Sequence, residues 1–113
     1  MNAKEANELS LKNKPIYDAM VIGENYLKHM KFIEDATVRG DFEIHNTDLL
    51  PENVRMLEIE GYYISWIFSA QSVYWGDAAI KRKEIDEAIR LAEENRKKEK
   101  QENKKWYQLQ SWR

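Results

Sequence analysis

The chain has 113 residues, of which 42% are hydrophobic and 34% charged, with a formal net charge of −2 and no cysteine. This length fits one domain, and the lack of cysteine excludes disulfides, a thiolate nucleophile and cysteine-ligated metal. The N-terminal residues do not have the apolar stretch of a secretion signal, and no run of about 18 apolar residues predicts a membrane span. We therefore expect a cytoplasmic protein without a membrane partner.

The charges are distributed unevenly along the chain. Residues 1–75 hold 7 Lys and Arg against 12 Asp and Glu, whereas residues 76–113 hold 11 against 8. The two parts therefore carry −5 and +3. This asymmetry, with the patterns below, predicts an acidic α+β body at 1–75 and a long charged C-terminal helix with an aromatic tip at 76–113, within one domain.

The first 40 residues predict two helices. Asn2, with Glu5 three residues later, is typical of an N-cap, and a short first helix should end at residues 13–14, just before Pro15. Pro15 suits the first turn of a second helix, which Gly40 should end. Apolar residues recur along this second helix at three- and four-residue spacing, which predicts one shared apolar face. They are Ile16, Ala19, Met20, Gly23, Tyr26, Leu27, Met30, Ile33 and Ala36.

Two short strands and one short helix are predicted next. Residues 41–45 alternate polar and apolar side chains, the period of a half-buried strand. Pro51 opens a short helix that Gly61 closes. Residues 62–68 are rich in aromatic and β-branched side chains, which favours a second strand. We expect the two strands to pair as a small sheet against the helices, in a mostly α, α+β fold.

A long helix is predicted from an N-cap at Asp77 to about Lys105. Residues 93–105 have no apolar side chain, so this part should project into solvent or fray. The first half carries an apolar stripe that a second copy could cover as easily as the protein's own body. We predict a homo-oligomer, because a body of about 75 residues buries a modest core. The predicted oligomer interface is Ile85, Ala88, Ile89 and Ala92.

Aromatic residues are denser between 62 and 75 than a small core requires. Alternate members could fill the core, or the remainder could form a surface that binds a protein or stacks a base. Aromatic residues return at 106–113, which either fold back onto the body or dock on a partner. The predicted partner-binding residues are Tyr63, Tyr74, Trp75, Trp106, Tyr107, Leu109 and Trp112.

No residue pattern predicts catalysis, a cofactor or a metal site. His29 and His45 are the only histidines, and neither has the neighbours that a metal site needs, so both are expected at the surface or its rim. The serines and glycines form neither a nucleophile elbow nor a phosphate loop. The basic residues at 96–105 alternate with glutamates, which favours a solvated helix over a nucleic-acid contact.

Several segments resemble a type of small open reading frame common in tailed bacteriophages. The similar segments are residues 2–10, 33–44, 50–54 and 57–66, and the resemblance covers roughly residues 2–67. Those proteins run helix, strand, helix, an LE-x-x-GY turn and a strand ending in YxISW, which match LEIEGY and YYISW here. The motifs are fold signals. After Trp66 the family members tend to stop, whereas this chain adds a long helix.

The resemblance implies a phage origin and a location in the host cytoplasm. The leading hypothesis is a non-enzymatic accessory protein that binds a host or phage protein, for example to inhibit a host defence system or a host enzyme. Two alternatives remain. One is a protein that sequesters a small ligand or nucleotide on its aromatic surface. The other is a virion or assembly component.

Overall fold

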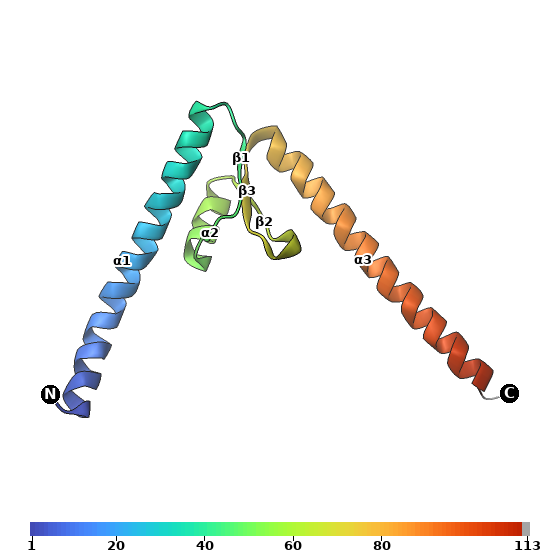
Figure 1. Ribbon diagram of the computed structural model, residues 1–113, viewed down its shortest axis with the longest axis horizontal. Coiled ribbons are helices and arrows are strands. Elements are labelled where there is room, and N and C mark those ends of the chain that lie inside the picture. The colour runs from blue at the N-terminus through green and yellow to red at the C-terminus, as the bar shows by residue number, and fades with distance from the viewer. Residues whose placement is uncertain (112–113) are drawn as a thin grey trace.

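Two long helices diverge from a small sheet in the computed structural model, which describes the backbone of residues 1–111 and the side chains of residues 1–67 and 69–102 (Figure 1). The chain is mainly helical, which confirms the predicted α+β, mostly α class. The elements in order are α1 (Ala3–Val38), β1 (Glu43–Ile44), α2 (Pro51–Ile59), β2 (Tyr63–Ser65), a 3-10 turn (Ile67–Ser69), β3 (Ser72–Tyr74) and α3 (Gly76–Ser111).

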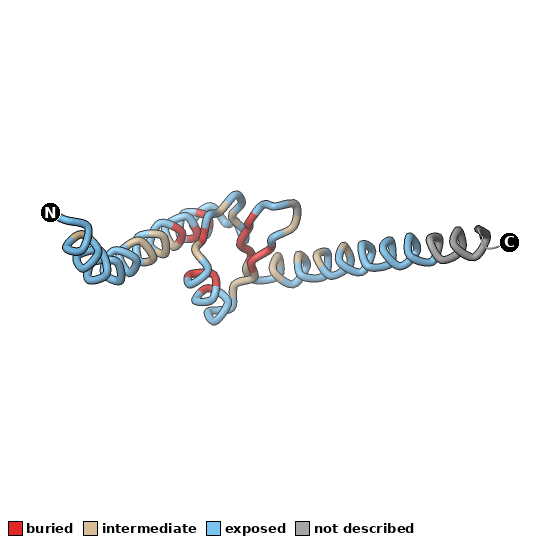
Figure 2. The backbone as a smooth tube through the Cα atoms, turned by 90° about the horizontal axis from the view of Figure 1, so that it is seen from below, coloured by how far each residue is buried: buried red, intermediate tan, exposed pale blue. Residues whose placement is uncertain are grey.

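The molecule is much more extended than a compact chain of its length. Its radius of gyration is 22.5 Å and its extents are 73 × 51 × 20 Å, whereas a compact domain of this size has a radius of gyration of about 13 Å. The buried residues are confined to the middle of the molecule, where α1, α2 and the sheet meet (Figure 2). The N-terminal half of α1 and most of α3 therefore project from this centre without cover from the described part of the chain.

The sheet has three strands in the order β1-β3-β2, and both pairings are antiparallel. Val73 in the central strand pairs with Ile44 on one side and with Ile64 on the other. The prediction of two directly paired strands is therefore wrong. The second predicted strand stops at Ser65, and the 3-10 turn reverses the chain through Ser69, whose φ is +62°. This reversal inserts β3 between the other two strands.

The core is small and draws on α1, α2, the sheet and the loop at residue 49. Around it pack the half-buried side chains of Tyr26, Met30, Ile44, Tyr62 and Trp75. The short helix α2 begins at Pro51 and is followed by Gly61 at a φ of +97°, which confirms the predicted helix and its end. The hydrophobic cluster at the centre consists of Ile33, Leu49, Val54, Leu57, Ile64 and Val73.

Helix α1 begins as predicted but does not break where predicted. The Asn2 side-chain oxygen accepts a hydrogen bond from the Glu5 N–H at 2.9 Å, and its amide donates to the Glu5 carboxylate at 3.2 Å. The expected end before Pro15 is wrong, because one helix runs through this residue. Proline removes one hydrogen-bond donor, but its fixed φ is already helical, so a single missing bond does not end the helix.

The predicted single apolar face of this helix is divided between two sides. Ile33 and Ala36 are buried against the body, whereas Ile16, Met20 and Leu27 are exposed.

The second long helix, α3, also differs slightly from its prediction. It begins at Gly76, with Asp77 in its first turn and not as the N-cap, and it extends beyond residue 105 to Ser111.

Candidate partner-binding surface

Helix α3 is attached to the sheet by a network of polar side chains. The Tyr63 hydroxyl donates a hydrogen bond to Oδ2 of Asp86 at 2.6 Å, and Nε of Arg82 lies 2.9 Å from Oδ1 of the same carboxylate. The Arg82 guanidinium also lies over the ring of Tyr74, 5.7 Å from its centroid. Arg82 thus contacts both the carboxylate and the tyrosine ring, which fixes the first turns of α3 against β2 and β3.

The environment of Tyr63 favours its neutral phenol. Desolvation is the largest cause, and the hydrogen bond to the Asp86 carboxylate is the second, and together they raise the pKa of Tyr63 to about 12. A phenol that is neutral near pH 7 keeps its proton for this hydrogen bond. Tyr63 is therefore held in one orientation at the edge of the sheet.

A groove runs between the β2 end of the sheet and the outer part of α3. Apolar side chains of the sheet and the 3-10 turn line one wall, and charged side chains of α3 form much of the other. Trp66, which directly follows β2, is 58% exposed, an unusual exposure for so large an apolar side chain. The groove is lined by Tyr63, Ile64, Trp66, Ile67, Asp86, Ile89, Arg90 and Glu93.

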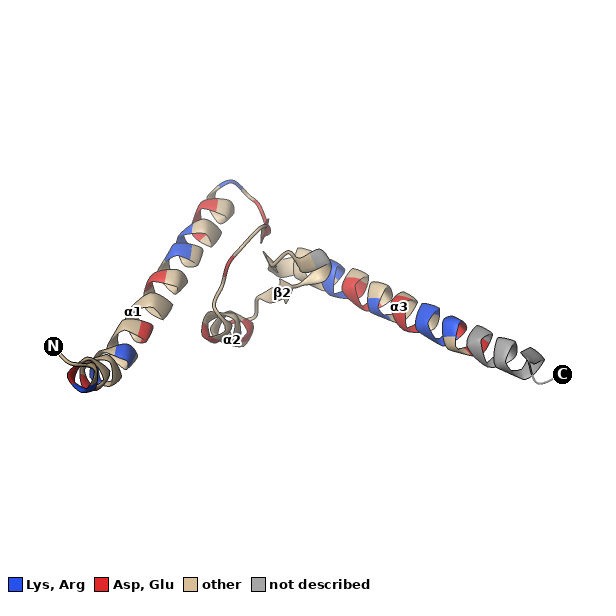
Figure 3. Cartoon of the chain, turned by 60° about the horizontal axis from the view of Figure 1, so that its bottom comes forward, with Lys and Arg blue, Asp and Glu red and all other residues tan. Residues whose placement is uncertain are grey.

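The charged wall of this groove carries both signs. Arg90 is paired with Glu87 at 3.1 Å and with Glu94 at 2.9 Å, on the solvent side of α3. Basic and acidic side chains continue to alternate along the helix (Figure 3). A wall of this kind has no continuous positive surface, which a nucleic-acid phosphate backbone would need.

The structure separates the aromatic residues that the sequence grouped as a binding surface. Tyr63 lines the groove, whereas Trp75 is half-buried with its ring edge-on to Tyr62, 5.9 Å between centroids. Tyr74 is only 5% exposed, so its predicted place on an exposed surface is wrong. The reason is that Tyr74 belongs to the central strand, which the sequence analysis did not detect.

Trp66 is the most exposed large apolar residue of the groove, and the sequence pattern does not single it out. The pattern predicts a continuous strand at residues 62–68, in which its side chain would alternate with its neighbours. The strand instead ends one residue earlier, at Ser65. The available signal was the tryptophan directly before a turn-forming segment.

The predicted oligomer stripe on α3 is largely uncovered by the chain itself. Ile85, Ala88 and Ala92 are exposed, and Ile89 is half-buried at the groove. The exposed members continue the apolar character of the groove along α3. The predicted binding residues of the aromatic tip, Trp106, Tyr107, Leu109 and Trp112, lie outside the side chains that the structure describes.

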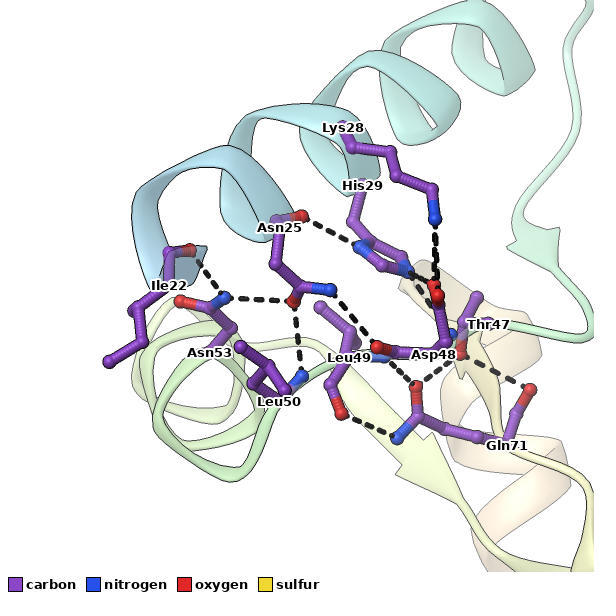
Figure 4. Close-up of polar contacts among 10 residues, drawn as sticks. All are labelled: Ile22, Asn25, Lys28, His29, Thr47, Asp48, Leu49, Leu50, Asn53 and Gln71. Atoms are coloured by element: carbon purple, nitrogen blue, oxygen red, sulfur yellow. Dashed lines mark hydrogen bonds and ion pairs between the residues drawn. The ribbon is translucent and has the colours of Figure 1, made fainter. Parts of the chain in front are cut away.

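A buried polar cluster joins α1 to the loop at residues 47–50 (Figure 4). The ring of His29, which is 1% exposed, has Nδ1 2.7 Å from the main-chain oxygen of Asn25 and accepts the main-chain N–H of Asp48 on Nε2 at 3.2 Å. Nζ of Lys28 lies 3.1 Å from both carboxylate oxygens of Asp48 and holds the pKa of that carboxyl below its usual value. The expectation of a surface or rim position for His29 is therefore wrong.

Three side-chain amides, those of Asn25, Asn53 and Gln71, complete this cluster. Oδ1 of Asn25 accepts the main-chain N–H of Leu50 at 3.0 Å and the side-chain amide of Asn53 at 2.9 Å. The buried Gln71 accepts the main-chain N–H of Leu49 at 2.7 Å. The main-chain N–H groups of Leu49 and Leu50 have no partner in a helix or strand, so these side-chain oxygens accept their hydrogen bonds instead. The cluster therefore positions the loop between α1 and α2.

The other histidine lies at the rim of the sheet. Nδ1 of His45 is 3.2 Å from the hydroxyl of Ser72, and half of its side chain is exposed. Among the residues whose side chains are described, no three His, Asp or Glu side chains are grouped as a metal site would require. No described helix combines the length and the apolar character needed to cross a bilayer.

Comparisons with known proteins give no relative for this chain. No protein-family model matches it, and neither the curated proteins nor the solved structures contain a significant match.

Proposed function

We propose that the protein is a non-enzymatic accessory protein of phage origin that acts by binding a host or phage protein in the groove between β2 and α3. The observation that carries this proposal is the exposed Trp66 in a groove with one apolar wall. Tryptophan is enriched among interface hot spots, which become buried in well-packed pockets on binding.

The composition of the groove favours a protein as the bound molecule. Trp66, Tyr63 and Arg90 belong to the three residue types that are enriched in hot spots of protein interfaces. Tyr63 is already fixed by Asp86, so binding costs little side-chain entropy there. The mixed charges of Arg90 and Glu93 suit the polar rim of an interface.

The resemblance of residues 2–67 to small phage proteins supports the biological setting. In that setting the bound protein is a host or phage protein, for example a component of a host defence system or a host enzyme, and binding occurs in the host cytoplasm. The segment after Trp66 is the part absent from those proteins. It supplies one wall of the groove, so the target is specific to this chain.

The proposal is tested by affinity capture from host cells with matched variants. Trp66→Glu places a charge at the groove, whereas Ile59→Glu places the same charge on α2 at a residue that is 83% exposed and away from the groove. We expect the wild type and Ile59→Glu to retain one protein in a fixed ratio, and Trp66→Glu to lose it. In calorimetry, the purified target should bind the wild type and Ile59→Glu with similar affinity and should bind Trp66→Glu much more weakly.

Two outcomes would contradict this function. A target held equally by Trp66→Glu would exclude the groove as the site. A nucleotide or other small molecule released from the heat-denatured protein, and absent from Trp66→Glu, would instead support a sequestering role for the aromatic surface.

A further inference from the structure

Helix α1 carries a second apolar stripe on the side that faces away from the body. At 3.6 residues per turn, the stripe residues lie within about 40° of one another, nearly opposite His29, Ile33 and Ala36, which pack on the body. The stripe is solvent-exposed along its whole length. It consists of Leu9, Ile16, Met20 and Leu27.

The spacing of this stripe is that of a coiled coil. Positions 9, 13, 16, 20, 23 and 27 are separated alternately by four and three residues. Asn13 and Gly23 occupy the two positions that are not large and apolar. This seven-residue repeat ends at Leu27, because Met30, the next position, packs on the protein's own core. The repeat predicts a helical partner, since another helix can meet such a seam along its length.

The N-terminal half of α1 lacks the means to remain helical alone. Residues 3–20 contain no buried side chain and one ion pair, Lys14 to Asp18 at 3.6 Å. They also contain Pro15, which disfavours a helix interior, and isolated helices of this length are marginal in water. In α3, by contrast, the ion pairs of Arg90 with Glu87 and Glu94 support the helix as far as residue 94. The N-terminal half of α1 therefore gains most from cover by a partner.

Gly23 is a second sign of a close neighbour. A Cβ atom at this position would meet nothing within 4 Å, so no contact within the described chain requires glycine there. Glycine in a helix interior is destabilising relative to alanine. A missing side chain on the exposed seam does, however, allow another helix to approach closely.

We propose that α1 of a second copy covers this stripe in an antiparallel pair. In the antiparallel register centred on residue 18, Leu9 of one subunit lies opposite Leu27 of the other, and Ile16 lies opposite Met20. Asn13 then lies opposite Gly23, where the missing side chain leaves room for its amide. A parallel pair in register would place Gly23 opposite Gly23 and leave a void in the seam, which costs stability.

The rest of the molecule is compatible with this pair. The body lies on the opposite side of α1 from the stripe, so the two bodies sit at opposite ends of the pair without blocking the seam. Positions 10, 17 and 24 flank the seam along one edge, where the same edge of the partner helix faces them. Along this edge Ser10 of one subunit lies next to Glu24 of the other, and Tyr17 lies next to Tyr17 of the second copy near the two-fold axis. No like charges are opposed there, as coiled-coil pairing requires.

The area involved predicts a reversible dimer. Covering a leucine-sized side chain removes roughly 60–120 Å² of apolar surface. Four such side chains from each subunit remove on the order of 500–1,000 Å², which is below the area of stable interfaces and in the range of weak, transient ones. We therefore expect a dimer that dissociates at micromolar concentration.

The first experiment measures mass against concentration for two matched variants. Ile16→Glu puts a charge on the seam, and Leu11→Glu puts the same charge on the same free arm but off the seam; the two wild-type residues are 69% and 66% exposed. At high micromolar concentration, sedimentation equilibrium should approach twice 13.5 kDa for the wild type and Leu11→Glu, and should show the monomer mass for Ile16→Glu. A wild type that stays monomeric at high micromolar concentration, or an Ile16→Glu variant that still dimerises, overturns the proposal.

The second experiment tests the orientation in this cysteine-free chain. A mixture of Leu9→Cys and Leu27→Cys chains should form a mixed disulfide under mild oxidation. Leu9→Cys alone should form none, because the two copies of residue 9 are about 27 Å apart in the antiparallel register. A disulfide between two Leu9→Cys chains would establish a parallel pair and refute the proposed one. Trp66→Glu should leave dimerisation unchanged, which separates this surface from the target-binding groove.

Discussion

His29 and Asp48 meet through two atoms of the aspartate. Nε2 of the buried ring accepts the main-chain N–H of Asp48 at 3.2 Å and also lies 2.9 Å from its carboxylate oxygen Oδ1. The other ring nitrogen, Nδ1, lies 2.7 Å from the main-chain oxygen of Asn25, one turn earlier on α1. The imidazole therefore connects the helix to the loop that leads into α2.

Replacing His29 by leucine should destabilise the body strongly. The apolar side chain leaves the Asp48 N–H without its acceptor and fits poorly between α1 and the loop, so we expect a loss of about 2–4 kcal/mol in the free energy of unfolding. Urea denaturation measures this loss. His45→Leu is the matched control, because this histidine is half exposed, and it should change stability by at most about 0.5 kcal/mol. Equal effects of the two substitutions would refute the structural role of His29.

The carboxylate of Asp48 should add an acid-dependent part to stability. Its pKa is lowered in the fold, chiefly by the hydrogen bond from Lys28, so the carboxylate stabilises the fold above its unfolded pKa of about 3.9. This contribution is lost as the pH falls through the lower folded pKa. Asp48→Asn should therefore be less stable than the wild type at pH 7, by less than His29→Leu because Asp48 is exposed. The gap should close in strong acid.

The measurement is the urea midpoint of both proteins from neutral pH down to about pH 2, which is below the carboxyl pKa values. Asp18→Asn serves as the control, because Asp18 pairs only with Lys14 on the free arm. A constant difference between Asp48→Asn and the wild type across this range would exclude the proposed linkage.

The parts of the fold that local chemistry determines could be predicted from the sequence. The three-residue spacing of Asn2 and Glu5 predicts the cap at the start of α1. Pro51 and Gly61 predict the two ends of α2, because each favours the backbone conformation found there. The central strand β3 could not be predicted, because three residues are too short to show an alternating pattern. Its place depends on hydrogen bonds with strands that begin 29 and 9 residues earlier in the chain.

The candidate site could be predicted only in part for the same reason. The aromatic density identified Tyr63 as a surface residue, but its orientation depends on Asp86, 23 residues away. Likewise, the burial of His29 depends on a loop 19 residues later that places a main-chain N–H over the ring. Such long-range pairings leave no periodic signal in the sequence.

Tyr63→Phe should weaken the attachment of α3 to the sheet. The substitution removes the hydroxyl that donates to Asp86 and leaves one carboxylate oxygen without this partner, so we expect a loss of about 1–2 kcal/mol. Tyr17→Phe, on the exposed arm of α1, is the control and should be neutral at concentrations that keep the chain monomeric. Chemical denaturation at pH 7 measures both. A Tyr63→Phe variant as stable as the wild type would show that the hydrogen bond does not stabilise the fold.

The same tyrosine should make stability sensitive to alkali. The pKa of Tyr63 is raised from 10.0 to about 12, so its neutral form contributes stability that is fully present below the unfolded pKa. This contribution is lost as the pH rises through that value toward about 12. The stability difference between the wild type and Tyr63→Phe should therefore shrink over this interval. A difference that stays constant in alkali would contradict the assignment.

Pro15→Ala should strengthen the free arm of α1 without stabilising the body. Alanine restores the N–H that proline lacks and favours a helix interior by about 3 kcal/mol relative to proline, but residues 3–20 contain no buried side chain. At protein concentrations low enough to keep the chain monomeric, helix content by circular dichroism and amide protection at residues 11–20 should rise. The urea midpoint of the body, followed by tryptophan fluorescence, should stay the same.

Pro51→Ala is the control, because Pro51 opens α2, where no intrahelical bond is missing, and it should leave the protection of α1 unchanged. If Pro15→Ala raised the midpoint of the body by its full local effect, the arm and the body would unfold as one unit, and the arm would not be the independent segment that the burial pattern indicates.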